Sequence, residues 1–334
     1  MNTQHIISIF TVITFVIFAN ISCDSVQASL EGEALVPGKR YSGKVLKNKI
    51  LSYSDRKIVS YETMLNHLNN SRVIFLGEFH NSVPTHEYQL RIIQDIYKKH
   101  RQIAIAMEMF ERDTQAVLNK FLSGNLSHKM FLKKSRPWSN YLSDYKPIID
   151  FAKAHGLDVL AMNTPRFLIR KVVSKGNKYI LSLKGKKRGY LARKVRLKDK
   201  KYRDFFQKLL PQGHHFSKKQ KTMYQRFLLA SMVKDSTMAE SIARYLKKPR
   251  HKGHKLFSIN GKFHSDYGIA IPSRLKRRIP GIRIAIVSFI PLRDKDSLDL
   301  SRYLGKNKQA DFLVFTDDKR SFVPTFHKSS SKKS

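Results

Sequence analysis

The stretch Val73–His80, VIFLGEFH, joins an apolar run typical of a buried strand to a polar end. A second stretch of the same form, Leu256–His264, reads LFSINGKFH. Apolar runs recur between helix-like segments at Val73–Leu76, Ile103–Met107, Val159–Met162, Leu256–Ile259, Ile282–Phe289 and Phe312–Phe315. This alternation is typical of a parallel sheet between helices. We therefore predict an α/β fold with a mostly parallel sheet, covered by helices on both faces and carrying a helical insertion.

Helical periodicity indicates Glu87–Lys99, Asp144–His155 and the long segment Lys218–Leu246 as helices. The long segment carries one apolar stripe at helical spacing, made of Leu228, Met232, Ala239, Ile242 and Leu246. Asp235 falls in the middle of this stripe. Its carboxylate is either paired in the core or turned into a pocket, and the pattern leaves both open.

The segment Lys184–Arg203 contains eleven Lys or Arg residues and one Asp, and two glycines interrupt it. Like charges and glycines oppose burial and regular structure. We expect this segment to be a mobile, solvated excursion at the periphery of the fold.

The whole chain has 64 Lys and Arg residues against 25 Asp and Glu, a net charge of +39. Such a charge attracts anionic surfaces, polymers or ligands. A general preference for basic surface residues would produce the same balance, and both explanations stay open. Because the basic residues are spread along the chain without a standard nucleic-acid motif, we expect no specific nucleic-acid partner.

An apolar leader, Ile6–Ile21, is followed at once by Ser22 and by Cys23, the one cysteine of the chain. The leader has the apolar core of a signal peptide, and its length is below the roughly 20 residues that a membrane-spanning helix needs. A cysteine directly behind such a core resembles a bacterial lipobox, although Asn20 departs from that pattern. We expect export and lipidation at Cys23, with ordinary cleavage as the alternative.

These observations divide the chain into a signal peptide over 1–23, a tether over 24–49, one α/β domain over 50–322 and a disordered basic tail over 323–334. With a single cysteine the domain cannot contain an internal disulfide. Its stability must come from the apolar core, which 41% hydrophobic residues are sufficient to build.

Polar side chains follow the apolar runs where the strands are expected to end. Glu78 and His80 follow the first run, Glu108 the second and His264 a later one. The carboxyl ends of parallel strands meet at one edge of a sheet, which is where ligands bind in such folds. Imidazole and carboxylate groups are ligands for zinc, iron or manganese. The pattern predicts a shared metal site of Glu78, His80, Glu108 and His264, with hydrogen-bonded rim residues and no ligand as the alternative.

Several motifs carry a resemblance to a known family. They are GEFHNSVPTHEYQ (Gly77–Gln89), MEMFERDTQ (Met107–Gln115), the pair Trp138 and Tyr145, NTPRFLIRKV (Asn163–Val172), DSTMAESI (Asp235–Ile242) and GKFHSDYGIAIPSRL (Gly261–Leu275). Together they resemble the ChaN-type haem-binding lipoproteins, over roughly Val73–Pro291. That family shares a superfamily with the Tiki and TraB metal-dependent hydrolases and with erythromycin esterase.

The resemblance implies a haem-binding α/β domain in the bacterial cell envelope, in the periplasm or at the outer membrane, with a role in haem or iron uptake. Positions that match the family's pocket motifs are Glu78, His80, His86, Glu108, Arg166 and His264. The family often has a histidine pair where this chain has Thr85 and His86, which puts a second-histidine role in doubt.

Haem needs an axial donor for its iron and cations for its two propionates. Within the matching motifs Tyr145 and Tyr267 are our candidates for the axial ligand, and Arg166 or Arg170 for a propionate. His86 completes the expected haem-binding residues. Ordinary packing of each tyrosine, with its hydroxyl in water, is the alternative.

The favoured interpretation is therefore a haem carrier without enzymatic activity, anchored to the membrane by lipid and with a homodimer left open. The first alternative is a metal-dependent hydrolase in which Glu78, His80, Glu108 and His264 hold a divalent metal whose bound water attacks an amide or ester. The second is a module that binds anionic polymers through its charge. Catalytic residues stay unassigned.

Overall fold

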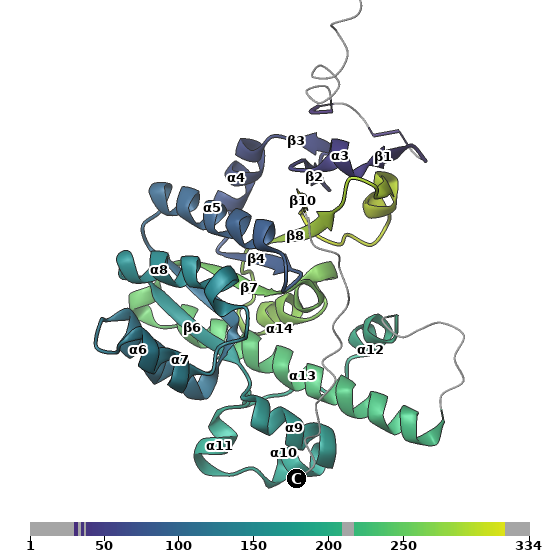
Figure 1. Ribbon diagram of the computed structural model, residues 1–334. Coiled ribbons are helices and arrows are strands. Elements are labelled where there is room, and N and C mark those ends of the chain that lie inside the picture. Colours follow the sequence, from purple (N-terminus) through teal and green to yellow (C-terminus); the bar gives the residue numbers. More distant parts are fainter. Residues whose placement is uncertain (1–29, 33–34, 37, 209–216, 318–334) are drawn as a thin grey trace, which may run out of the picture.

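The computed structural model describes residues 30–32, 35–36, 38–208 and 217–317. A central sheet crosses the described part (Figure 1). Its strands, in spatial order, are β3 (Lys57–Val59), β2 (Ile50–Ser52), β10 (Phe312–Asp317), β8 (Ile284–Leu292), β4 (Val73–Glu78), β7 (Lys255–Gly261), β5 (Ile103–Glu111) and β6 (Asp158–Asn163). All neighbours from β10 to β6 pair in parallel, whereas β2 pairs antiparallel with β10 and β3. The mostly parallel sheet is confirmed.

Five of the six predicted apolar runs lie wholly within strands of this sheet, the sixth, Ile282–Phe289, begins two residues before β8, and all six strands continue beyond the carboxyl end of their run. β4 continues through Gly77 and Glu78, and β5 continues through Glu108 to Glu111, with every residue buried. Glu78 and Glu108 are thus the buried last part of strands and not residues that follow them. This buries two carboxylates inside the sheet, which requires partners for both.

Helices cover both faces of the sheet. In the described part they are α3 (Gly43–Leu46), α4 (Tyr61–Asn69), α5 (Val83–Lys99), α6 (Gln115–Leu122), α7 (His128–Ser135), α8 (Lys146–Ala154), α9 (Arg166–Lys175), α10 (Asn177–Ser182), α11 (Gly185–Gly189), α12 (Lys200–Gln207), α13 (Lys218–Leu246) and α14 (Ile271–Arg278). The helices α4 to α8 pack on one face and α13 and α14 on the other, each against its own buried apolar cluster. The predicted two-sided cover is confirmed.

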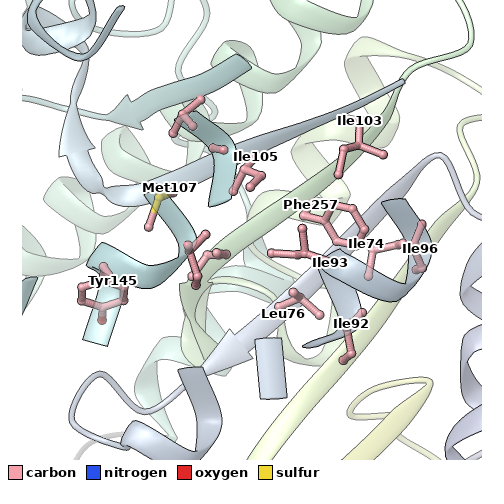
Figure 2. Packing of buried hydrophobic residues seen from close by; sticks show 14 of the residues in the cluster. Ile74, Leu76, Ile92, Ile93, Ile96, Ile103, Ile105, Met107, Tyr145 and Phe257 are labelled. Atoms are coloured by element: carbon pink, nitrogen blue, oxygen red, sulfur yellow. The ribbon is translucent and has the colours of Figure 1, made fainter. Parts of the chain in front are cut away.

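The apolar cluster on the α5 side is drawn in Figure 2. Ile92, Ile93 and Ile96 of α5 lie against Ile74 of β4 and Phe257 of β7, and all five are fully buried. The α5 residues recur at helical spacing and the strand residues at alternate positions, which is what lets one helix stripe meet one sheet face. This packing fixes β4 and β7 side by side, with their carboxyl ends at the same edge.

The long helix α13 begins and ends where the periodicity predicted. Ser217 caps it, and Gln220 completes a reciprocal capping box that satisfies two backbone N–H groups. In its apolar stripe, Ala239, Ile242 and Leu246 are buried against the sheet and α14, and Leu228 and Met232 pack with Tyr202 of α12. Asp235 within the stripe is fully buried. Asp235 therefore lies inside the fold at the level of the strand ends.

The insertion between β6 and α13 contains α9 to α12 and packs along α13 (Figure 1). The prediction that Lys184–Arg203 is a peripheral, solvated excursion is wrong. Leu191 and Ala192 are fully buried, the Ala192 backbone N–H donates to Thr237 Oγ1 at 3.1 Å, and Tyr202 is fully buried. Apolar residues between the basic ones reach the core, while most Lys and Arg side chains of the segment stay exposed.

The fold begins before the predicted boundary at Ile50. Arg40–Ser42 forms β1, which pairs with β9 (Ser297–Asp299) in a second, two-stranded sheet, and Leu46 of α3 is fully buried. The predicted tether over 24–49 therefore ends before Arg40, and not at Lys49. The predicted leader, Cys23 and the tail 323–334 lie outside the described residues. Among the helices that the structure describes, none has the length and apolarity to cross a membrane.

Candidate functional site

Glu78 lies at the carboxyl end of β4 and is buried, with 1% of its surface exposed. One carboxylate oxygen accepts hydrogen bonds from His80 Nδ1 at 2.9 Å and from the Tyr145 hydroxyl at 2.6 Å. The other accepts from Gln89 Nε2 at 2.8 Å, and His86 Nε2 lies 3.2 Å from it. The strand end, α5 and the turn before α8 thus converge on one carboxylate.

These partners keep Glu78 ionised. Burial raises its pKa, but the electrostatic interaction with His86 and the hydrogen bond from His80 outweigh burial and lower the pKa of Glu78 to about 2. The same contact raises the pKa of Tyr145 well above its usual value, because burial and the negative charge of Glu78 both oppose its ionisation. Tyr145 therefore acts here as a hydrogen-bond donor.

Glu108 on β5 forms a second cluster. Its Oε1 lies 3.0 Å from Lys234 Nζ and 3.2 Å from His264 Nε2, and its Oε2 accepts from the Gly261 backbone N–H at 3.0 Å. Burial raises its pKa, but the charges of His264 and Lys234 hold the pKa of Glu108 well below its usual range. Lys234 is the counter-charge that lets this carboxylate stay buried and ionised.

Asp235 extends the second cluster into the core. Its Oδ1 lies 2.5 Å from His264 Nδ1, and its Oδ2 accepts a short hydrogen bond from the buried Tyr202 hydroxyl. The two possibilities that the sequence left for this carboxylate are resolved in favour of pairing within the core. His264 is thereby held between two carboxylates, which fixes its ring.

The two clusters meet at Gly261. A Cβ on Gly261 would lie 2.7 Å from His80 Nε2 and 3.8 Å from Glu108 Oε2, so only glycine leaves room for the His80 ring beside the second cluster. The four residues predicted as a shared site, Glu78, His80, Glu108 and His264, are therefore neighbours at one edge of the sheet. His80 is the member that solvent reaches, with 36% of its side chain exposed and its ring edge-on to Trp138.

The arrangement does not suit a cation. In the part of the chain that the structure describes, no group of three or more His, Cys, Asp or Glu side chains is placed to hold a metal ion. The physical reason is that the carboxylate oxygens are already occupied by donors, and that the Lys234 ammonium sits 3.0 Å from Glu108. A metal would have to displace these donors and approach a fixed positive charge.

The predicted haem-binding residues fall into two groups. Tyr145 and His86 are 0% and 3% exposed and both face Glu78, so their side chains are buried in the Glu78 cluster, and a haem contact by either of them stays a prediction. Arg166 is exposed, but its Nε lies 2.5 Å from Glu111 Oε1, which already neutralises it. Tyr267 is 41% exposed and stays available.

A larger site lies beside this edge, between α9 and α13. The cavity there has a volume of about 1010 Å³. It is lined by Ile169, Arg170, Val173, Ser174, Phe206, Gln220, Met223, Tyr224, Arg226, Phe227, Ala230, Ser231 and Lys234. We call it the α9–α13 groove. Lys234 belongs both to this groove and to the Glu108 cluster, so the groove adjoins the polar edge of the sheet.

The sequence patterns missed Lys234, Gln89 and Tyr224. Gln89 and Lys234 stand at ordinary helix positions, and only the contacts to Glu78 and Glu108 distinguish them. The sequence does contain a signal for the groove around Tyr224. Met223 and Phe227 are large apolar residues one helical turn apart, and both lie off the buried stripe of α13. Both are more than 40% exposed, at 42% and 49%, which marks an uncovered apolar surface.

Comparison with known proteins identifies similar sequences. The sequence profile of a family described as haem-binding uptake, Tiki superfamily, ChaN matches residues 64–275. The curated relative Protein RETICULATA-RELATED 5, chloroplastic, of Arabidopsis thaliana is 24% identical over 304 residues. That alignment covers 86% of this chain, which spans 39% of the relative's length.

Solved structures share the fold. A structure described as cofacial heme binding to ChaN of Campylobacter jejuni has a TM-score of 0.58 at 19% identity, over 84% of this chain and 98% of that one. A mutant erythromycin esterase in its open conformation has a TM-score of 0.42 at 12% identity, over 73% of this chain and 76% of that one. The first similarity supports the common fold, and the second is too low to support any argument.

Proposed function

The chain belongs to the haem-binding uptake family of the Tiki superfamily, ChaN, whose profile matches 64–275, and we propose on this basis that it binds haem. The observation that carries the proposal in this chain is the α9–α13 groove. Its volume of about 1010 Å³ is at the upper end of the range for small-molecule sites. The Campylobacter jejuni relative, described as binding heme cofacially, has the same fold.

The groove has the chemistry that haem requires. Ile169, Val173, Met223 and Phe227 supply apolar surface for a porphyrin face. Arg170 and Arg226 line the same space, and two cations there match two propionates. Arg170 was one of the two arginines that the sequence favoured for a propionate contact. The other, Arg166, is already paired with Glu111, so Arg170 is the better candidate.

Tyr224 is the residue of the groove best suited to hold the iron. Tyrosine is a known axial ligand of haem iron. Burial raises the pKa of Tyr224, so its hydroxyl stays protonated until a ferric ion binds it. Tyr267 is the competing candidate. A series of contacting aromatic rings connects the two tyrosines. The distances between ring centroids are 5.6 Å for Tyr267–Phe205, 5.2 Å for Phe205–Phe263, 5.8 Å for Phe263–Phe206 and 5.4 Å for Phe206–Tyr224.

The test is an optical titration of the metal-stripped protein with ferric haem. We expect a saturable haem spectrum with the charge-transfer band of a phenolate ligand. Tyr224→Phe should remove that band and weaken binding, whereas Tyr267→Phe, which changes the competing exposed tyrosine outside the groove, should leave both unchanged. Arg170→Gln should weaken binding about threefold to tenfold with the band unchanged, because it removes one charged contact to a propionate.

Two outcomes would contradict the proposal at different levels. A loss of the band in Tyr267→Phe but not in Tyr224→Phe would show that the iron is bound outside the groove. Haem binding itself would still hold. A protein that shows no saturable haem spectrum at all would refute haem binding itself.

A hydrolase is the second candidate, favoured by the environment of His80. The Glu78 carboxylate accepts from His80 Nδ1 at 2.9 Å, and 36% of the side chain is exposed. A carboxylate that orients an accessible imidazole in this way suits a general base acting on water. Under this hypothesis His80→Ala removes turnover of a model ester and leaves haem binding unchanged. Failure of the haem-free wild type to turn over amide and ester substrates would remove this candidate.

We further propose that the protein is an exported lipoprotein of the cell envelope that takes part in haem or iron uptake. Support comes from the apolar leader Ile6–Ile21 and from the position of Cys23 directly behind it. A lipid on Cys23 would hold the haem-binding domain at a membrane surface.

A further inference from the structure

A second cavity lies where the basic segment passes over the far ends of α13 and α14. Its volume is about 470 Å³. It is lined by Arg193, Lys194, Val195, Arg196, Glu240, Ala243, Arg244, Lys247, Arg277 and Arg278. We call it the basic cavity. None of these residues lines the α9–α13 groove, so this site is separate from the proposed haem site.

The basic cavity brings seven Lys and Arg side chains together around a single carboxylate, Glu240. Glu240 is only 8% exposed and is fully engaged by neighbours. It accepts from the Arg193 backbone N–H at 2.8 Å and lies 2.8 Å from Arg244 Nη2 and 3.4 Å from Arg112 Nη1. It therefore cannot neutralise the remaining cations of the cavity.

Four of these cations have no partner among the residues that the structure describes. Within the ranges that the structure describes, the side chains of Arg193, Lys194, Lys247 and Arg277 make no hydrogen bond or ion pair, and all four are exposed. Like charges held around one cavity repel one another. The arrangement is destabilising by itself, and an anion bound in the cavity would relieve the repulsion.

The helix dipole explains part of this charge. Lys247 and Arg277 stand at the carboxyl ends of α13 and α14, where cations are favoured in many proteins. Arg193 and Lys194 stand in the segment between α11 and α12, where no helix end accounts for them. Their convergence on the same cavity is a property of the tertiary fold.

Arg278 holds the walls of the basic cavity together. It donates to the Arg274 carbonyl at 3.0 Å within α14 and to the Lys194 carbonyl at 2.9 Å across the cavity. Burial, together with the nearby Arg274, lowers its pKa. These two hydrogen bonds fix the backbone of the basic segment against α14. An anion can therefore bind the cations without the entropic cost of ordering the chain.

We propose that the basic cavity binds a phosphate-bearing anion. Arginine forks match phosphate oxygens in paired hydrogen bonds, and several converging cations favour a multiply charged group over a single carboxylate. The same chemistry belongs to a soluble polyphosphate and to the headgroup of an anionic phospholipid. The role goes beyond haem binding and does not depend on it.

The experiment uses the full-length protein with two probes. Inorganic tripolyphosphate is titrated by calorimetry, and vesicles of phosphatidylcholine with or without phosphatidylglycerol are used in co-sedimentation. The variant Arg193→Gln, Lys194→Gln, Arg277→Gln should weaken binding at least about tenfold, since three charged contacts are lost. Binding to tripolyphosphate alone identifies a soluble ligand, and binding that requires phosphatidylglycerol identifies a lipid headgroup; each supports the proposal.

The matched control is Lys120→Gln, Lys129→Gln, Lys133→Gln, which removes the same charge from exposed positions on α6 and α7. It should change binding less than about threefold, because α6 and α7 lie on the opposite face of the sheet from α13 and α14 and salt screens distant charges. Equal losses in both variants would show a general field effect and overturn the proposal, as would a wild type that binds neither probe. The single change Arg277→Glu, at an exposed site, repeats the test if the triple variant unfolds.

Discussion

The charge on His264 makes the stability of the fold depend on pH. His264 lies between Glu108 and Asp235, 3.2 Å and 2.5 Å from their carboxylates. Burial lowers its pKa, but the two negative charges outweigh burial and raise the pKa of His264 to about 9, against 6.5 in the unfolded chain. The difference of about 2.5 in pKa corresponds to about 3 kcal/mol in the free energy of unfolding. Because the folded-state pKa is the higher one, this stabilisation is complete below pH 6.5 and is lost as the pH rises through about 9.

The perturbation is His264→Gln, which keeps a polar side chain and removes the charge. Urea unfolding is followed by the fluorescence of Trp138, the one tryptophan of the chain, from about pH 6 to about pH 9.5. The wild type should lose about 3 kcal/mol more than the variant over this range. Titrating groups that do not contact His264 cancel in the comparison. His155→Gln, at an exposed histidine, is the matched control and should retain the wild-type pH dependence.

A constant difference between wild type and His264→Gln across the range would refute the reasoning. So would a direct measurement by ¹⁵N NMR in which His264 titrates at or below pH 6.5. Asp235→Asn offers a check that keeps the histidine, because removal of one of the two charges should lower the pKa of His264 and shift the loss of stability to lower pH.

Three further changes test other parts of the structure. Tyr202→Phe removes the hydroxyl that donates to the buried Asp235 and should lower the free energy of unfolding by about 1–3 kcal/mol in urea; an unchanged midpoint would contradict that hydrogen bond. Gly261→Ala would place a Cβ 2.7 Å from His80 Nε2, so a loss of about 1–3 kcal/mol and a shifted His80 NMR signal are expected, and a neutral effect would mean that the ring is not there. Cys23→Ala should move the protein from the membrane to the soluble fraction, and a wild type without lipid at its N-terminus by mass spectrometry would disprove the anchor.

Local patterns in the sequence were sufficient for the sheet and the main helices. The continuous apolar run Val73–Leu76 predicts a strand buried on both faces, and the helical spacing of the α13 stripe predicts which face of that helix is buried. Because parallel strands end at one edge, the meeting of Glu78, His80, Glu108 and His264 also followed from the strand pattern alone.

The basic segment shows where such reasoning failed. Its composition indicated a solvated excursion, yet Leu191, Ala192 and Tyr202 are fully buried against α13. Net charge averages over a segment, whereas burial is decided for each side chain separately. A few apolar residues among many lysines and arginines are therefore enough to pack the segment against α13.

Only the tertiary structure decided what each buried carboxylate contacts. Lys234 and Glu108 are 126 residues apart, and no local pattern joins them, yet their contact makes a hydrogen-bonded charge cluster where the sequence suggested a metal site. The same holds for the groove around Tyr224. The physical reason is that periodicity reports which face of an element is buried, while the partner on that face is set by the packing of segments that are distant in the chain.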